Sequence, residues 1–347
     1  MVDILFVTRG RGRGHATTDA AIVKALHEID RDVSVQFASY SVGCRALIEL
    51  GYVPIDFGLH VEASFPQVAL AVGNAIRLSC PRIVVAHEEP AAMTIGKLLN
   101  TRTVFLTHWF AWPENIGTES LEHADRIIFL ERQGIFYEPS QVKGRILYTG
   151  PLIRPLDTST LDFEEIRRSL GIDLQTKLIV ILPGSTPEVE EPIFQLALSA
   201  FDALHARHKR LIWVGGSDTA SISAQVGCRG DVAVVEFEPY VERVAFAADL
   251  VITKGTYNTC RELEALGIDF IALSFGNNFV DDCYLRLSSK ARVRDPKLIT
   301  ISELTSEMSR TRQHARPRKF QGTAIQTVAN DVLSVLHGHS GKDKTLV

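Results

Sequence analysis

Short runs rich in β-branched and aromatic residues alternate with longer helical patterns along the whole chain of 347 residues. This alternation constrains the fold more than any other feature, because strands separated by helices join a parallel sheet whose two faces the helices cover. The sequence therefore predicts an α/β fold class with doubly wound parallel sheets. The predicted strands are Ile4–Thr8, Val33–Ala38, Ile83–Ala86, Thr103–Thr107 and Arg126–Phe129 in the first half, and Leu178–Leu182, Arg210–Val214, Val232–Phe237, Leu250–Thr253 and Phe270–Leu273 in the second.

The chain is longer than one hydrophobic core usually organises, so two domains of roughly 150 residues each are expected. Gly150, Pro151 and Pro155 interrupt regular structure between the two series of strands. We therefore expect an N-terminal domain over residues 1–150 and a C-terminal domain over 151–320. Residues 321–338 are expected to form a helix that packs back on the N-terminal domain, and the polar residues 339–347 a flexible tail.

Composition narrows the class of function. No apolar run reaches the ~18 to 20 residues of a membrane span, and a formal net charge of -4 gives no general attraction to nucleic acid. The five cysteines are far apart and form no C-x-x-C pair, so neither a metal site nor a disulfide framework is predicted. The N-terminus opens directly on a strand-like run, which favours a cytoplasmic protein.

The turn after the first predicted strand contains Gly10, Gly12 and Gly14, and it leads into a helix that we expect to begin near Asp19. Glycines let the backbone approach a ligand closely. The spacing is not G-x-G-x-x-G, and the second strand does not end in a carboxylate, so NAD is disfavoured. His15 stands where an imidazole could take a proton from an acceptor hydroxyl. The alternative is a tight connection with solvent-facing arginines.

The segment from Ala248 to Leu263 runs from a buried strand through a turn of small residues into a helix. Backbone N–H groups at such a turn bind phosphate oxygens, with Lys254 nearby and the hydroxyls of Thr256 and Thr259 as further donors. Glu262 lies one helical turn later, where it could accept hydrogen bonds from a ribose diol. Thr259 and Glu262 also fit a capping box that would only close the helix.

Two further turns follow predicted strands of the second half, at Gly184–Ser185 and at Gly215–Gly216. Ligands of open α/β sheets bind outside the carboxyl ends of strands, so these turns point to one binding region. Asp281 and Asp282 follow the next strand and suit sugar hydroxyls, although an ordinary polar surface loop has the same composition.

Taken in order, these segments resemble the family 28, or MurG-like, glycosyltransferases over nearly the whole chain. Gly10 to His15 resembles the family's G-G-x-x-G-H turn, Tyr148 to Arg154 its T-G-N-P-[VI]-R linker, and Ala248 to Gly267 its donor signature. The resemblance implies the GT-B fold, in which two Rossmann-like domains face each other across a cleft. The first domain would bind the acceptor and the second the nucleotide-sugar, with no metal and no cofactor beyond that co-substrate.

The resemblance also implies roles for single residues. His15 would be the active-site histidine, Thr259 would lie in the phosphate-binding turn, and Glu262 would bind the ribose. Asp281 and Asp282 stand where the family has a sugar-binding glutamine pair, and Thr256 stands at a usual glycine, so the donor sugar stays open. On the acceptor side we expect Gly12, Gly14, Glu88 and His108, with Glu88, Glu89 or His108 orienting His15 or the acceptor.

The sequence thus predicts an inverting, metal-independent glycosyltransferase that uses a nucleotide-sugar, with UDP as the expected nucleotide. The acceptor, whether a carbohydrate, a lipid-linked group or a small molecule, stays open, as does peripheral contact with the inner face of a membrane. Two alternatives remain. One is a nucleotide-sugar epimerase or hydrolase of the same fold, and the other is a nucleotide-sugar-binding protein without turnover.

Overall fold

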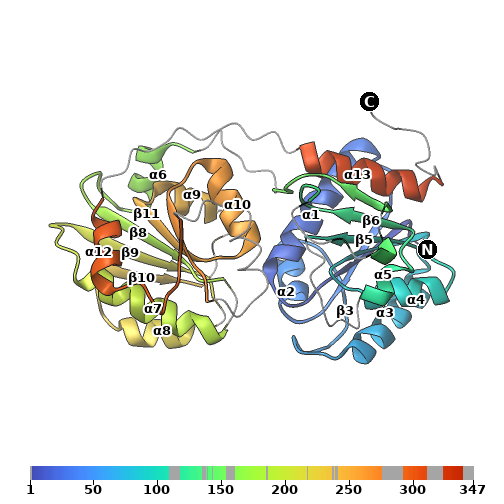
Figure 1. Ribbon diagram of the computed structural model, residues 1–347, viewed down its shortest axis with the longest axis horizontal. Coiled ribbons are helices and arrows are strands. Elements are labelled where there is room, and N and C mark those ends of the chain that lie inside the picture. Colours follow the sequence, from blue (N-terminus) through green and yellow to red (C-terminus); the bar gives the residue numbers. More distant parts are fainter. Residues whose placement is uncertain are drawn as a thin grey trace. The chain divides into compact units, whose positions relative to one another are not determined.

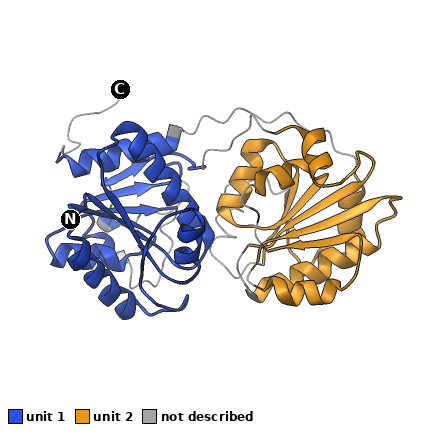
Figure 2. Ribbon diagram, turned by 180° about the vertical axis from the view of Figure 1, so that it is seen from behind, with its two compact units in different colours: residues 1–155, 322–347 blue, residues 156–321 orange. Residues whose placement is uncertain are grey.

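The computed structural model describes residues 2–108, 118–134, 138, 140–142, 144–153, 161–184, 187–216, 218–236, 238, 241–275, 292–310 and 323–338. The chain divides into two compact units (Figure 2). Unit 1 comprises Met1–Pro155 with Gly322–Val347, and unit 2 comprises Leu156–Gln321. Unit 1 is therefore built from both ends of the sequence.

Unit 1 contains a seven-stranded sheet in the order β3-β2-β1-β4-β5-β6-β7, and every neighbouring pair is parallel. All residues of β1 and β4 are buried, as expected for strands covered by helices on both faces. The first and the last predicted strands of this half have the expected bounds. The short edge strands β3 and β7 have too few residues to show a pattern, and we did not predict them. The strands are β1 Ile4–Thr8, β2 Val35–Ser39, β3 Ile55–Asp56, β4 Ile83–His87, β5 Arg102–Thr107, β6 Arg126–Phe129 and β7 Ile146–Tyr148.

The C-terminal helix α13 is part of the core of unit 1. It packs against α1, and Val328 and Val332 are completely buried in the same hydrophobic cluster as Ile4 and Ile22 (Figure 1). The Asp331 carboxylate accepts two hydrogen bonds from the guanidinium of Arg126, at 2.7 and 2.8 Å. The helices of unit 1 are α1 Arg13–Ile29, α2 Ser41–Glu49, α3 Phe65–Ser79, α4 Ala91–Leu98, α5 Thr118–Leu121, the 3-10 helix η1 Ser140–Val142, and α13 Thr323–Leu336.

Unit 2 contains a six-stranded parallel sheet in the order β10-β9-β8-β11-β12-β13. The strand over 270–273 has its predicted bounds, whereas β10 ends two residues before the predicted Phe237, which lies outside the described residues. The strands are β8 Lys177–Leu182, β9 Lys209–Val214, β10 Val232–Val235, β11 Leu250–Lys254, β12 Phe270–Leu273 and β13 Val293–Arg294. The helices are α6 Phe163–Ser169, α7 Pro187–Asp202, α8 Thr219–Val226, α9 Val241–Ala247, α10 Tyr257–Leu266 and α12 Ile301–Ser309.

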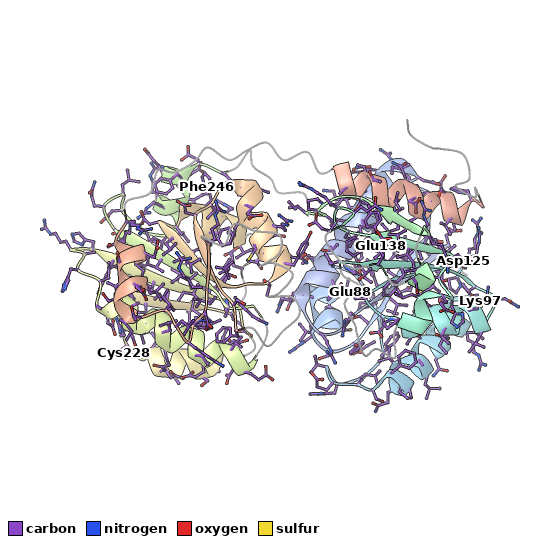
Figure 3. All side chains as sticks on the ribbon, in the orientation of Figure 1. Glu88, Lys97, Asp125, Glu138, Cys228 and Phe246 are labelled. Carbon is purple, nitrogen blue, oxygen red and sulfur yellow. The ribbon has the colours of Figure 1, made fainter. Side chains whose placement is uncertain are left out.

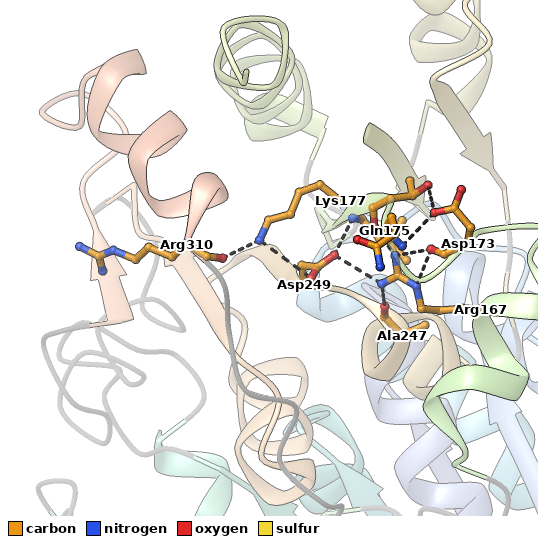
Figure 4. A network of polar contacts seen from close by, with 9 residues as sticks. Arg167, Asp173, Gln175, Lys177, Ala247, Asp249 and Arg310 are labelled. Carbon is orange, nitrogen blue, oxygen red and sulfur yellow. Dashed lines mark hydrogen bonds and ion pairs between the residues drawn. The ribbon is translucent and has the colours of Figure 1, made fainter. Parts of the chain in front are cut away.

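Arg167 of α6 holds the amino-terminal edge of this second sheet together (Figure 4). Its buried guanidinium donates to the backbone carbonyls of Asp173 and Ala247, each at 3.0 Å, and lies 3.4 Å from the carboxylate of Asp249. Asp249 precedes β11, and its carboxylate accepts from the N–H of Leu178 in β8. This network ties three elements at the edge opposite the carboxyl ends of the strands, so we interpret it as structural.

The strand order places the same topological feature in both units. In each sheet the first strand of the unit lies inside, and the order reverses beside it, between β1 and β4 in unit 1 and between β8 and β11 in unit 2. Ligands of doubly wound sheets bind at the carboxyl ends of the strands at such a reversal. Among the described residues, no helix has both the length and the apolar character needed to span a bilayer.

Candidate functional site

The glycine-rich turn after β1 is shorter than expected, because α1 begins at Arg13 and not near Asp19. Gly12 is the N-cap in an extended conformation, and Gly14 and His15 lie in the first turn of the helix. The first residues of α1 are polar and include a glycine, so they lack the apolar stripe from which the start of a helix is predicted. A Cβ at Gly10 would lie 2.4 Å from the ring of Tyr40, and glycine is therefore needed there for packing.

Two of the arginines in this turn are exposed and paired, in agreement with the solvent-facing alternative. Arg11 lies 3.3 Å from the carboxylate of Glu62, and Arg13 hydrogen-bonds Glu49. The side chain of His15, in contrast, is directed at Glu88. The outward arginines of this turn thus match the alternative of a tight connection, whereas His15 is turned toward other polar side chains.

His15 meets Glu88, which directly follows β4 and is labelled in Figure 3. Nε2 of His15 lies 2.9 Å from Oε2 of Glu88. The other carboxylate oxygen accepts from His108, after β5, through its backbone N–H and its Nδ1, both at 3.2 Å. The side chain of Glu88 is 5% exposed and that of His15 is 21% exposed. The fold therefore brings together three of the predicted residues, at the strand-order reversal of unit 1.

Glu88 adopts a backbone conformation that favours glycine, with φ of 53°. A left-handed conformation costs a residue with a Cβ about 1 to 2 kcal/mol. It turns consecutive carboxylates to different partners: Glu88 to the two histidines, and Glu89 to the hydroxyl of Tyr40, which donates at 3.1 Å. Strain of this kind at a buried polar cluster is typical of functional sites.

The charges of this cluster are set by burial and by hydrogen bonds. Burial alone would raise the pKa of Glu88, but hydrogen bonds from His108 and His15 hold that pKa well below its usual range. Burial lowers the pKa of His15, and this effect exceeds the opposite effect of Glu88. A neutral imidazole therefore lies beside an ionised carboxylate. Since a carboxylate can only accept, the hydrogen is on Nε2 of His15 and the lone pair is on Nδ1. Such an imidazole can accept a proton from a hydroxyl group.

Glu89 has the opposite protonation tendency. Burial raises the pKa of its carboxyl group, and this outweighs the charge of Arg9 and the hydrogen bond from Tyr40. Arg9, after β1, also lies 3.8 Å from Glu88. The pKa values of two consecutive carboxyl groups are thus shifted in opposite directions, that of Glu88 downward and that of Glu89 upward.

A network of three completely buried residues, His87, Asp19 and Thr8, adjoins His15. Nδ1 of His87, the last residue of β4, donates to Oδ1 of Asp19 at 2.7 Å, and the hydroxyl of Thr8 donates to the other oxygen of Asp19, also at 2.7 Å. The ring of His87 meets that of His15 edge-on, with centroids 4.7 Å apart. Burial would lower the pKa of His87, but the charge and hydrogen bond of Asp19 raise it.

In unit 2, the turns after two neighbouring strands, β8 and β9, carry the predicted glycines. Gly184, after β8, has φ of 78°, and a Cβ there would lie 3.5 Å from Thr256 and 3.8 Å from Lys254. The turns after β8 and β11 are therefore in contact. Gly215 and Gly216 follow β9 with φ of 80° and 106°. A Cβ on the second of them would lie 2.9 Å from the carboxylate of Glu190, and its positive φ favours glycine whatever the space.

Helix α10 begins at Tyr257 with Thr256 as its N-cap. Thr259 therefore lies inside the helix, so the alternative in which Thr259 and Glu262 form a capping box is wrong. Thr256, Thr259 and Glu262 follow one another at intervals of three and share one side of the helix. Lys254, at the end of β11, is 2% exposed. Ser185, Asp281 and Asp282 lie outside the described residues.

No protein-family model and no curated protein matches the sequence. Solved structures do match, at low identity. MurG of Acinetobacter baumannii is 13% identical, with a TM-score of 0.59 over 96% of this chain and 100% of that chain. UDP-GlcNAc 2-epimerase from Neisseria meningitidis, bound to UDP-GlcNAc, is 12% identical, with a TM-score of 0.65 over 95% and 99%. Spinosyn rhamnosyltransferase SpnG, complexed with thymidine diphosphate, is 13% identical, with a TM-score of 0.58 over 96% and 96%.

The chain has the GT-B fold. The predicted fold class is confirmed. Sequence reasoning missed Asp19 and His87 as members of the polar cluster around His15. Asp19 is 68 residues from His87 in the sequence, and no local pattern connects them. The one available signal was the position of His87 at the end of a buried strand, directly before two glutamates.

Proposed function

We propose that this chain is an inverting, metal-independent glycosyltransferase that moves a sugar from a nucleotide-sugar, with UDP as the nucleotide, to an acceptor hydroxyl. The observation that carries the proposal is the hydrogen bond of 2.9 Å between His15 and the ionised Glu88 at the strand-order reversal of unit 1. Two of the similar structures hold UDP-GlcNAc or thymidine diphosphate, and one of these is named as a rhamnosyltransferase.

In the proposed reaction, Nδ1 of His15 accepts the proton of the acceptor hydroxyl as its oxygen attacks the anomeric carbon. The bond from that carbon to the diphosphate oxygen breaks, and its electron pair leaves with the nucleotide, so the configuration inverts. Glu88 fixes the ring and stabilises the imidazolium that forms, which is the task of the orienting carboxylate in other catalytic sites. Gly12, Gly14 and His108 are assigned to the acceptor side.

The donor is assigned to unit 2. The N-terminus of α10, the hydroxyls of Thr256 and Thr259, and the ammonium group of Lys254 would offset the charge of the diphosphate in place of a metal ion. Glu262 would accept hydrogen bonds from the ribose. The turns at Gly184–Ser185 and Gly215–Gly216 would offer backbone N–H groups, and Asp281 and Asp282 are assigned to the sugar.

The described cysteines support a reducing compartment, and we place the reaction in the cytoplasm. They are free thiols: Cys44, Cys80, Cys228 and Cys260. Contact with the inner face of a membrane belongs to the proposal only if the acceptor is linked to a lipid.

One observation favours a second candidate, an epimerase or hydrolase acting on a nucleotide-sugar. The pKa values of Glu88 and Glu89 are shifted in opposite directions, and a pair of groups whose pKa values are pushed apart can act as a base and an acid. One of the similar structures is an epimerase. In that case Glu89 would protonate a leaving group or a carbon centre.

The decisive experiment follows radiolabelled sugar from a panel of nucleotide-sugars and acceptors. Label on the acceptor identifies a transferase, label in an isomeric nucleotide-sugar an epimerase, and free labelled sugar a hydrolase. Binding without any product identifies a binding protein.

The His15→Ala variant should lower transfer by ~10² to 10⁴, the usual contribution of general-base assistance, with unchanged UDP affinity. His123→Ala, which removes an exposed histidine of the same unit, is the control. A His15→Ala variant that keeps more than about a tenth of the turnover falls short of that range and contradicts the assigned role.

A further inference from the structure

His15, His87 and Glu88 form a cluster with the composition of a transition-metal site. One ring nitrogen of each histidine and one carboxylate oxygen of Glu88 lie within 4.8 Å of one another. The Glu88 oxygen and Nε2 of His15 are already 2.9 Å apart. Ligands of a tetrahedral zinc ion, bound at about 2.0 to 2.2 Å, lie roughly 3.3 Å from one another. To bind an ion, the side chains would have to rotate until the more distant of these atoms reach that separation.

The surroundings of His87 provide an independent second observation. Nδ1 of its ring is engaged by the buried carboxylate of Asp19, at 2.7 Å. Nε2, the other nitrogen, is buried and has no hydrogen-bond partner among the residues that the structure describes. Metal-binding histidines nearly always donate their second ring N–H to a carboxylate or carbonyl in this way. A buried imidazole nitrogen without a partner is uncommon, and a bound ion would satisfy it.

The charge of the cluster suits a cation. Glu88 and Asp19 supply two carboxylates within the network. The positively charged guanidinium of Arg9, 3.8 Å from Glu88, offsets part of their negative charge. Two imidazoles with one carboxylate favour zinc or a similar transition metal over magnesium or calcium, which prefer oxygen ligands. Three protein ligands also leave one coordination position open.

We propose that His15, His87 and Glu88, supported by Asp19, bind a divalent transition-metal ion of the zinc type, and that the bound ion inhibits the enzyme. The inhibitory part rests on the proposed function. If the ion binds Nδ1 of His15, it occupies the lone pair that accepts the proton. If the ion binds Nε2, the hydrogen of Nε2 moves to Nδ1, and the lone pair is again lost. The ion and the acceptor proton thus compete for one imidazole.

Binding is tested by titrating zinc chloride alone into the untagged, full-length chain after removal of metal, by calorimetry or competition with a chromophoric chelator. We expect one ion per chain. His87→Asn retains an N–H that can reach Asp19 but removes Nε2, and it should weaken binding at least tenfold. Asp19→Asn should weaken it by roughly 10 to 100-fold, the usual effect of a lost supporting hydrogen bond. His123→Asn is the matched control and should bind like the wild type.

NMR of the wild-type protein tests the site even if one of the variants fails to fold. One equivalent of Co²⁺ should shift or broaden the ring signals of His15 and His87 in the NMR spectrum and leave those of His123 unchanged. Wild-type affinity no tighter than that of His87→Asn, or cobalt effects confined to other histidines, would overturn the site.

Inhibition is scored separately, as the rate with zinc divided by each variant's own rate without it. Zinc should inhibit the wild type at the concentration that fills the site, and His87→Asn should resist at that concentration. Binding without any transferase activity would contradict the proposed function and leave the metal site standing. Activity that persists with the site filled would overturn the inhibitory part alone.

Discussion

Replacing Glu88 with glutamine tests the pairing of His15 with a charged carboxylate while nearly preserving shape. Two unit charges 2.9 Å apart attract by about 6 kcal/mol at an effective dielectric constant of ~20. His15 is 21% exposed, and the amide of glutamine keeps part of the hydrogen bonding, so we expect about half of that attraction to be lost when the imidazolium forms. A loss of ~3 kcal/mol corresponds to roughly a hundredfold lower turnover.

The same substitution has a signature in the pH dependence. His15 accepts a proton only when it is neutral, so turnover is present above its pKa and is lost as the pH falls through it. Glu88 raises the pKa of His15 through its hydrogen bond and charge. Glu88→Gln should therefore lower the pKa of His15 and move the acidic limb of the rate profile to lower pH. General damage to the fold would lower the rate without this displacement.

The assay is the initial rate of transfer at saturating donor, between about pH 4 and 9, corrected for the folded fraction. Glu62→Gln is the control, because Glu62 is an exposed glutamate of the same unit whose partner is Arg11. It should leave both the rate and the acidic limb unchanged. A Glu88→Gln variant with less than about a threefold loss and an unmoved acidic limb would refute the pairing.

The other predictions concern both units. Glu88→Gly should be more stable than Glu88→Ala by about 1 kcal/mol in urea unfolding, because φ is 53°; equal stability would contradict the strain. Glu262→Ala should weaken UDP binding by roughly tenfold to a hundredfold in calorimetry, the effect of losing a hydrogen bond to a charged group; unchanged affinity would remove it from the ribose site. Turnover should survive EDTA, and loss that added divalent ions restore would contradict metal-independent transfer. Asp331→Ala should lower the melting temperature of unit 1, since two hydrogen bonds to Arg126 disappear, typically about 1 to 3 kcal/mol; an unaltered transition would show that this ion pair does not help to hold α13.

Much of the fold could be predicted from the sequence because central strands buried on both faces are continuous apolar runs. β1 and β6 therefore have their predicted bounds, and β4 differs by one residue. Helix starts are less visible. The first turn of α1 contains Gly14 and His15 in place of an apolar stripe. The N-cap of α10 is Thr256, three residues before the Thr259 of the capping-box alternative.

The candidate site was predictable only in part. His15, Glu88 and His108 were each chosen because they follow a strand, and strand ends meet at one edge of a parallel sheet. The sequence did not predict that His15 pairs with Glu88 and not with Glu89. That pairing accompanies a left-handed backbone conformation at Glu88, which no sequence pattern indicates. The buried pair of Asp19 and His87 depends on contacts between residues far apart in the sequence, which local patterns do not encode.

Because α13 belongs to the core of unit 1, this unit cannot be completed on the ribosome until the last described segment has emerged. Unit 2 is contiguous and is synthesised in full before α13, so it can fold first although it begins later. Meanwhile the surface of α1 that α13 covers stays open, and exposed apolar surface of this kind promotes aggregation of nascent chains. A chain terminated before Thr323 should therefore retain a folded unit 2 attached to an unfinished unit 1 that chaperones must shield.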